Sequence, residues 1–154
     1  NRLGASVLMI SRGMPFFLAG EEMLRTKGGD SNSYASSDEV NNLDWEALTP
    51  DSAAWAMSCF YRDLIAMRKA NPFLWTAEPS CEILEGSVIA VTWSQDGATV
   101  ACAFVNPGEE ALETALPDGF WTVLLAGGKV FPDGGEVLGG SAEVPARGVL
   151  LLRG

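Results

Sequence analysis

A short apolar run followed by a long polar stretch limits what this chain can fold into. Residues 15–19 (PFFLA) are apolar throughout and lie between Gly13 and Gly20. A run of this length between glycines is typical of a strand that is buried on both faces, as in a parallel sheet. Residues 20–48 then show no sustained periodicity and are rich in Gly, Asp, Ser and Asn. Because ordinary connections have about 4–6 residues, we expect a loop this long to be either functional or disordered.

Helical patterns flank the apolar run and its loop. In residues 3–11 apolar side chains recur with helical spacing, and Arg12-Gly13 provides a C-terminal stop. Thr49-Pro50-Asp51 has the residue types of a helix start, and an apolar 3–4 pattern continues to Asn71-Pro72. Helix, buried strand and helix in this order are typical of an α/β domain. Because one strand cannot close a parallel sheet, we expect the first half to be the last piece of such a domain.

The pattern changes near residue 76, where short strands begin to alternate with turns. Turn residues such as Gln95-Asp96-Gly97 and Pro117-Asp118-Gly119 separate the predicted strands, which cover residues 87–94, 99–105, 120–125, 142–144 and 149–153. This spacing predicts a small antiparallel β-sandwich. The sequence therefore predicts a mainly β chain with two domains, over residues 1–75 and 76–154.

Charge and hydropathy exclude some classes of partner. The formal net charge is -10, which argues against nucleic acid or a membrane surface as a partner. No apolar run reaches the roughly 18–20 residues that a membrane helix needs. The chain opens on Asn1 with neither an initiator Met nor a signal pattern, so we expect a piece of a longer polypeptide. These features leave the cellular location open.

The chain contains no histidine, and this limits its chemistry. Ser-His-Asp catalysis, Cys-His catalysis and the usual zinc ligand sets are excluded. Any chemistry has to rest on carboxylates, and no residue cluster predicts a metal or a cofactor. The three cysteines have no CxxC spacing, and we expect buried apolar side chains, with one disulfide still open.

The apolar run and its loop carry a resemblance to a known family. The segments "GMPFFLAGEEMLRTKGGDSNSY" and "NNLDW" resemble the end of the catalytic barrel in type I pullulanases. These are starch-debranching members of the α-amylase superfamily, glycoside hydrolase family thirteen. The resemblance is dense over residues 13–45. It implies that residues 14–17 are the eighth strand of a (β/α)8 barrel, that the helix from Pro50 is the last barrel helix, and that a C-terminal β-sandwich follows.

The resemblance implies a sugar-binding role for the loop. Active sites of (β/α)8 barrels are built from the loops after the strands, and amides and carboxylates suit sugar hydroxyls. It implies substrate-binding roles for four residues: Asp30, Asn32, Tyr34 and Asn42. Three alternatives stay open. Asp30 and Asn32 could merely form Asx turns, Tyr34 could pack the loop, and hydrogen bonds from Asn42 could fix it.

Neighbouring residues are expected to be structural. We expect Glu21 and Glu22 to anchor the base of the loop, with Arg25 or Lys27 as partners. Hydrogen bonds that fix the loop are favoured for Asn41 and Asp44, and anchoring to the barrel for Trp45. The aromatic residues of the second half are expected in the core: Trp75, Trp93, Phe104, Phe120 and Trp121.

The family's catalytic residues are not in this chain. Its members use an Asp nucleophile, a Glu acid/base and a further Asp on earlier barrel strands, and they retain the anomeric configuration. The resemblance thus implies an inert C-terminal portion of an enzyme that cleaves α-1,6 links in pullulan or limit dextrin, with the rest of the barrel and an α-glucan as partners. The alternative is a self-standing carbohydrate-binding or purely structural β-sandwich.

Overall fold

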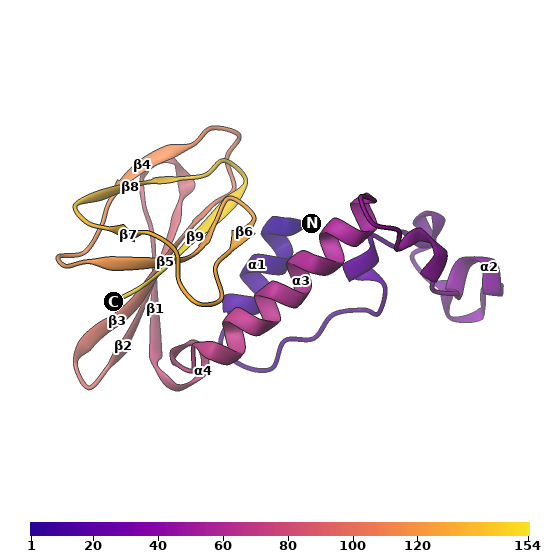
Figure 1. Ribbon diagram of the computed structural model, residues 1–154, viewed down its shortest axis with the longest axis horizontal. Helices are drawn as coiled ribbons and strands as arrows, with labels where there is room; N and C mark the ends of the chain where they lie inside the picture. Colours follow the sequence, from indigo (N-terminus) through magenta and orange to yellow (C-terminus); the bar gives the residue numbers. More distant parts are fainter. The chain divides into compact units, whose positions relative to one another are not determined.

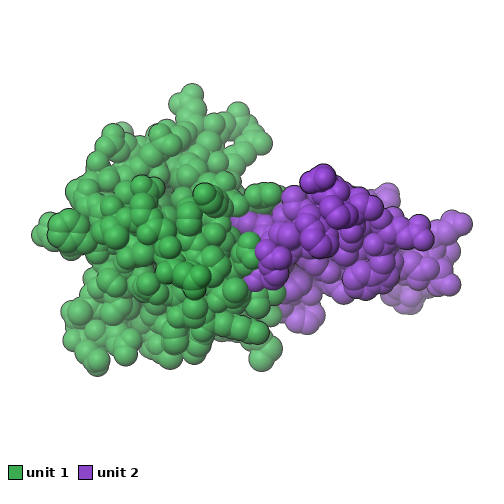
Figure 2. Space-filling model, in the orientation of Figure 1, with its two compact units in different colours: residues 1–15, 63–154 green, residues 16–62 purple.

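The computed structural model describes residues 1–154 and contains two compact units (Figures 1 and 2). The first unit comprises residues 1–15 and 63–154, and the second comprises residues 16–62. The division falls inside the longest helix, α3 (Ala53–Ala70). These units are compact bodies rather than the predicted domains, so the boundary at residues 75 and 76 stays a prediction.

The first unit is built around a seven-stranded antiparallel sheet (Figure 1). Its strand order is β1-β2-β3-β9-β5-β6, and β7 also pairs with β5. The strands are β1 (Glu78–Ile83), β2 (Ile89–Gln95), β3 (Ala98–Asn106), β5 (Trp121–Ala126), β6 (Lys129–Val130), β7 (Val137–Leu138) and β9 (Gly148–Arg153). A second sheet pairs β4 (Leu112–Ala115) with β8 (Ser141–Val144). The short helix η5 (Glu85–Ser87) joins β1 to β2.

The central strands β3 and β9 are buried on both faces, which explains their continuous apolar runs. On one face Cys102 pairs with Leu152, and both belong to the core that includes Ala142 and Val144 of β8. On the other face, helix α1 (Arg2–Ile10) contacts β9, and α4 (Phe73–Thr76) contacts β2. Two sheets with helices on the outer face confirm the predicted mainly β, sandwich-type fold.

The predicted β2–β3 hairpin is confirmed. Asp96 and Gly97 join the two strands with φ of 53° and 80°. Positive φ at both central residues is the type I′ geometry that favours Asp-Gly.

The predicted core is correct in part. Trp93, Trp121 and Phe104 are buried, whereas Trp75 is 40% exposed and Phe120 is 82% exposed. These two residues lie outside the regular strands, where nothing forces alternate side chains inward.

The cysteines also differ from the prediction. Only Cys102 is buried, Cys59 is half-buried and Cys81 is exposed, and all three are free thiols. Cys81 lies on β1, the edge strand of the sheet, and every residue of β1 is exposed.

The start of α3 differs from the prediction too. The helix begins at Ala53, and the Trp55 amide donates to the Ser52 hydroxyl at 3.0 Å. Ser52 is therefore the N-cap instead of Thr49. Thr49 accepts the Ser52 amide in a preceding turn, in which Asp51 has a φ of 72°.

The apolar run predicted as a strand over residues 15–19 does not form one: residues 14–18 are irregular and residues 19–20 form a turn. A strand forms only where a neighbour pairs with its backbone, and no strand pairs with this segment. Its side chains still alternate: Met14 and Phe16 are 91% and 88% exposed, whereas Phe17 is half-buried. Within the second unit, the Phe17 and Tyr61 rings lie 5.1 Å apart.

The loop after this segment folds into five short helices, which explains its lack of periodicity. They are η1 (Glu21–Met23), η2 (Lys27–Gly29), η3 (Ser33–Ala35), α2 (Asp38–Asn41) and η4 (Trp45–Ala47). None exceeds four residues, and helices this short are not stable by themselves. Polar side-chain contacts must therefore stabilise them. None of the helices in the chain is long and apolar enough to cross a membrane.

Candidate functional site

A tight turn at Gly20 begins the loop. Its carbonyl accepts from the Met23 and Arg25 amides at 3.0 and 2.9 Å, and its φ of 99° favours glycine. A Cβ at this position would lie 2.9–3.0 Å from Arg25 and 3.0 Å from Leu43. Glycine is therefore required both by the backbone conformation and by the close approach of the far end of the loop.

Glu22 anchors this turn as predicted, but its partner is the Gly20 backbone amide instead of Arg25 or Lys27. Its carboxylate accepts the Gly20 amide at 2.9 Å, and its carbonyl accepts the Ser58 hydroxyl of α3 at 2.8 Å. The carboxylates of Glu21 and Glu22 also act on Tyr61. Burial chiefly, and then these two charges, raise the pKa of the Tyr61 phenol.

Asp30 forms the turn in the middle of the loop. Its Oδ1 accepts the Asn32 amide at 2.9 Å, and its Oδ2 accepts the Ser36 hydroxyl at 2.5 Å. The hydrogen bond from Ser36, followed by that from Asn32, lowers the pKa of this carboxyl. The Asx turn, one of the open alternatives, is therefore present. The carboxylate is exposed and keeps lone pairs free for a further donor.

Asn41 closes the same part of the loop. Its amide nitrogen donates to the carbonyls of Ser33 and Ser36 at 2.7 and 3.0 Å. The Lys27 ammonium donates to the Ser33 hydroxyl at 2.6 Å, and Ser33 is buried. Asp44 accepts the amides of residues 46 and 47 at 3.1 and 3.2 Å. The predicted loop-fixing roles of Asn41 and Asp44 are confirmed.

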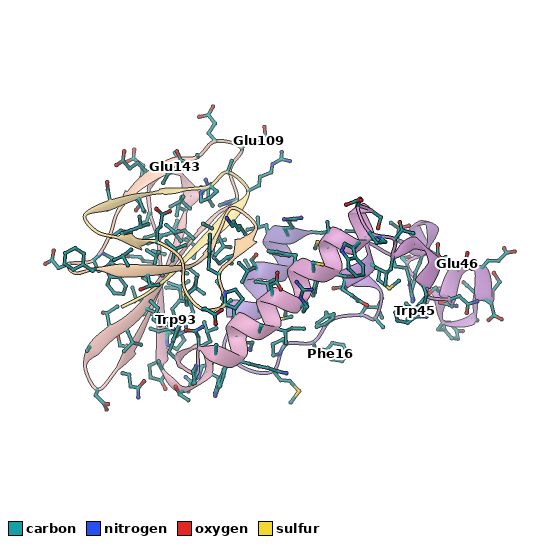
Figure 3. All side chains as sticks on the ribbon, viewed as in Figure 1. Phe16, Trp45, Glu46, Trp93, Glu109 and Glu143 are labelled. Carbon is teal, nitrogen blue, oxygen red and sulfur yellow. The ribbon has the colours of Figure 1, made fainter.

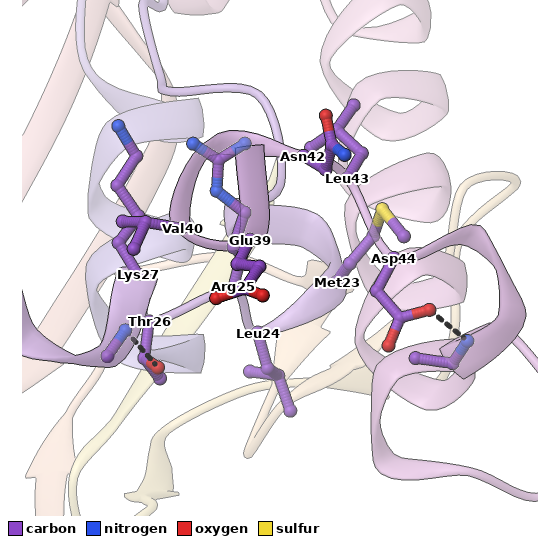
Figure 4. A pocket seen from close by; sticks show the side chains of 12 residues that line it. Met23, Leu24, Arg25, Thr26, Lys27, Glu39, Val40, Asn42, Leu43 and Asp44 are labelled. Atoms are coloured by element: carbon purple, nitrogen blue, oxygen red, sulfur yellow. Dashed lines mark hydrogen bonds between the residues drawn. The ribbon is translucent and has the colours of Figure 1, made fainter. Parts of the chain in front are cut away.

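A pocket of about 410 Å³ lies between the two ends of the loop (Figure 4). Its apolar wall includes Met23, Val40 and Leu43. Its polar groups are Arg25, Thr26, Lys27, Glu39, Asn42 and Asp44. The Lys27 ammonium, the Arg25 guanidinium and the Asn42 amide lie along the upper side of the view in Figure 4. The Nε atom of Arg25 is buried and has no hydrogen-bond partner.

The predicted sugar-binding residues do not all meet in this pocket. Asn42 lines it, whereas Asp30, Asn32 and Tyr34 lie outside its lining. Tyr34 is 88% exposed, so the chain itself does not pack over its ring. Trp45 is 65% exposed, and its predicted anchoring to the barrel stays a prediction (Figure 3).

The sequence reading missed Glu39, Val40 and Leu43 as lining residues of the pocket. The sequence feature that could have indicated them is Gly20. A residue without a side chain at this position leaves room for Leu43, so the two ends of the loop can approach each other.

The pocket combines donors and acceptors beside an apolar wall, which suits a polyhydroxylated ligand. Hydrogen bonding is what these groups can supply. The chain contains no group of three or more Cys, Asp or Glu side chains placed to hold a metal ion.

Comparison with known proteins identifies relatives of this chain. No protein-family profile matches the chain. The chain is 42% identical to the pullulanase of Bacillus subtilis (strain 168) over 75 residues, which is 47% of this chain and 10% of that protein. It is 36% identical to an isoamylase of Flavobacterium sp. over 110 residues, 68% of this chain and 14% of that protein.

Solved structures extend the similarity to almost the whole chain. The pullulanase from Bacillus acidopullulyticus matches with a TM-score of 0.86 and 26% identity, over 99% of this chain and 20% of that one. The chain resembles the pullulanases. A second pullulanase structure, from B. subtilis strain 168 in complex with maltose, matches 99% of the chain with a TM-score of 0.81 and 25% identity.

Together the matches support a C-terminal fragment of a pullulanase of glycoside hydrolase family thirteen. It spans about a tenth to a fifth of the length of the relatives that it matches.

Proposed function

We propose that this chain is the C-terminal part of a debranching glycoside hydrolase that cleaves α-1,6-glucosidic links in pullulan or limit dextrin. The observation that carries the proposal is the fold match to pullulanases over 99% of the chain. In the longer enzyme the chain contributes a substrate loop and a stabilising β-domain. Residues 1–75 complete the catalytic barrel, and residues 76–154 form the C-terminal sandwich domain.

The loop contacts the glucan through Asp30, Asn32, Tyr34 and Asn42. Two features support this role. Asp30, Asn32 and Tyr34 are exposed on a loop whose shape internal hydrogen bonds fix, so little ordering cost accompanies binding. The pocket beside Asn42 offers donors and acceptors of the kind that sugar hydroxyls need.

The rest of the barrel is the partner of residues 14–18. Phe16 is 88% exposed (Figure 3), and Met14 and Leu18 are 91% and 52% exposed. Apolar side chains that alternate in this way are typical of a strand. No strand of this chain pairs with the segment, and such an unpaired backbone can accept neighbouring strands.

The chain alone is inert. In the intact enzyme, retention requires a nucleophile and an acid/base about 5–5.5 Å apart. Those two carboxylates belong to the preceding barrel strands. Two carboxylates of this loop hold turns instead: Glu22 accepts the Gly20 amide, and Asp30 accepts the Ser36 hydroxyl.

Two variants of the longer enzyme test the loop assignment. Asp30→Ala removes both the carboxylate and the turn, whereas Ser36→Ala removes only one turn bond and keeps the carboxylate. We expect Asp30→Ala to raise the KM for pullulan about tenfold, the effect of losing one charge-assisted hydrogen bond, and Ser36→Ala to raise it less than threefold. Asp118→Ala, at an exposed turn of the sandwich, is the control. If Asp30→Ala and Ser36→Ala raised the KM equally, Asp30 would only hold the turn and would not contact the glucan.

A further inference from the structure

We propose that Arg68 is a positioning residue: it fixes the point at which the chain leaves helix α1 and enters the segment 14–18. The inference rests on the proposed function, because it assigns Arg68 an effect on substrate use in the longer enzyme. Arg68 lies in the last turn of α3 and belongs, like residues 9–13, to the first unit.

Three carbonyl oxygens receive hydrogen bonds from the Arg68 guanidinium. Nη1 donates to the Met9 carbonyl at 2.5 Å and to the Ser11 carbonyl at 2.9 Å, and Nη2 donates to the Gly13 carbonyl at 2.6 Å. The last carbonyls of a helix have no partner within the helix. Arg68 therefore caps the end of α1, and its planar guanidinium also holds Ser11 and Gly13, which follow the helix.

Burial makes this arrangement specific to arginine. The residue is 8% exposed, and its guanidinium carbon lies 5.7 Å from the centroid of the Trp75 ring. Desolvation lowers the pKa of the guanidinium, which nevertheless stays charged because the ordinary pKa of arginine lies far above neutral pH. Lysine would bring the charge but not two nitrogens at fixed spacing, so it cannot reproduce all three bonds.

The bond to Gly13 gives the arrangement a functional consequence. Gly13 has a φ of 105°, so the chain turns sharply at the residue that Arg68 holds. Met14 follows directly, and the segment 14–18 leads to Gly20 and the loop. Small displacements far from the reacting atoms cost catalytic efficiency, on the order of 100-fold per ångström. Loosening residues 11–13 therefore displaces the start of the predicted barrel strand.

The test compares Arg68→Lys with Lys69→Met in the protein encoded by the complete open reading frame. Lys69 is exposed and adjacent, so its variant controls for a lost charge on the same helix. The readouts are amide hydrogen exchange, thermal unfolding, and KM and kcat for pullulan. For Arg68→Lys we expect exchange at residues 11–18 to accelerate about tenfold or more while β3 and β9 stay protected, as loss of a charge-assisted hydrogen bond predicts. We expect KM to rise about tenfold with kcat within about twofold of wild type.

The outcomes separate three cases. A merely structural Arg68 would reduce the folded fraction, so Arg68→Lys would lower kcat and leave KM unchanged, which overturns the proposal. Wild-type exchange at residues 11–18 in the Arg68→Lys protein would also overturn it. Failure of the wild-type enzyme to hydrolyse pullulan would instead refute the proposed function, and the exchange data would still decide whether Arg68 fixes residues 11–13.

Discussion

The two sheets of the sandwich meet at Asn106, and its removal should measurably weaken the fold. Asn106 is fully buried at the end of β3. Its Nδ2 donates to the Glu110 carbonyl at 2.8 Å and, over a longer 3.4 Å, to the Val144 carbonyl of β8, while its Oδ1 accepts the Gly108 amide at 2.8 Å. Each short bond is worth about 1 kcal/mol, and partners left without a bond cost about 1–3 kcal/mol. Asn106→Ala should therefore destabilise the chain by about 2–4 kcal/mol.

Thermal unfolding followed by circular dichroism checks this value. For a chain of this size, each kcal/mol of destabilisation lowers the Tm by about 2–4 °C, so the Tm should fall by about 4–16 °C. Ser80→Ala is the matched control, because Ser80 loses one exposed hydrogen bond to Thr92 and should cost less than about 0.5 kcal/mol. If both variants unfolded at the same temperature, the buried bonds of Asn106 would not join the sheets as described.

Three further predictions concern single groups. Hydrogen bonds lower the Asp30 pKa below its ordinary 3.8, so the turn that this carboxylate holds should persist in acid and open only below about pH 3.8. The NMR shift of the Asn32 amide reports the opening. Opening near pH 5, well above the ordinary pKa, would contradict the hydrogen-bonded geometry. Ser52→Ala should lower the free energy of unfolding by about 1 kcal/mol, measured with denaturant, because it removes the N-cap of α3. An unchanged free energy of unfolding would mean that the cap does not stabilise the chain. Alkylation of the native chain should modify the exposed Cys81 and spare Cys102, whose burial raises its pKa to about 12; early modification of Cys102 would contradict its burial.

The sequence predicted the parts of the fold that depend on local chemistry. Asp96-Gly97 specified its hairpin because the type I′ turn that this pair favours matches the twist of the flanking strands. The apolar runs in β3 and β9 were recognised because both faces of these strands are covered. By contrast, strand β1 escaped prediction because it is an exposed edge strand that contains Pro79 and shows no alternation.

The misses arise where the outcome depends on distant partners. Residues 15–19 have the composition of a buried strand, but a strand needs neighbours that this chain does not supply. The pocket residues Glu39 and Leu43 come together with Arg25 through the turn at Gly20, and no periodic pattern reports such a contact. The roles of Asn41 and Asp44 were predictable because both residue types form local hydrogen bonds to the backbone.

The most direct test of the account is hydrolysis of pullulan, measured as release of reducing ends. It compares the protein encoded by the complete open reading frame with residues 1–154 alone. The account predicts activity in the former and none in the latter, because the proposed function assigns the catalytic carboxylates to barrel strands that precede this chain. Activity of residues 1–154 alone would contradict the assignment of the reacting groups to the rest of the barrel. An inactive complete protein that still bound maltooligosaccharides would instead indicate a carbohydrate-binding module.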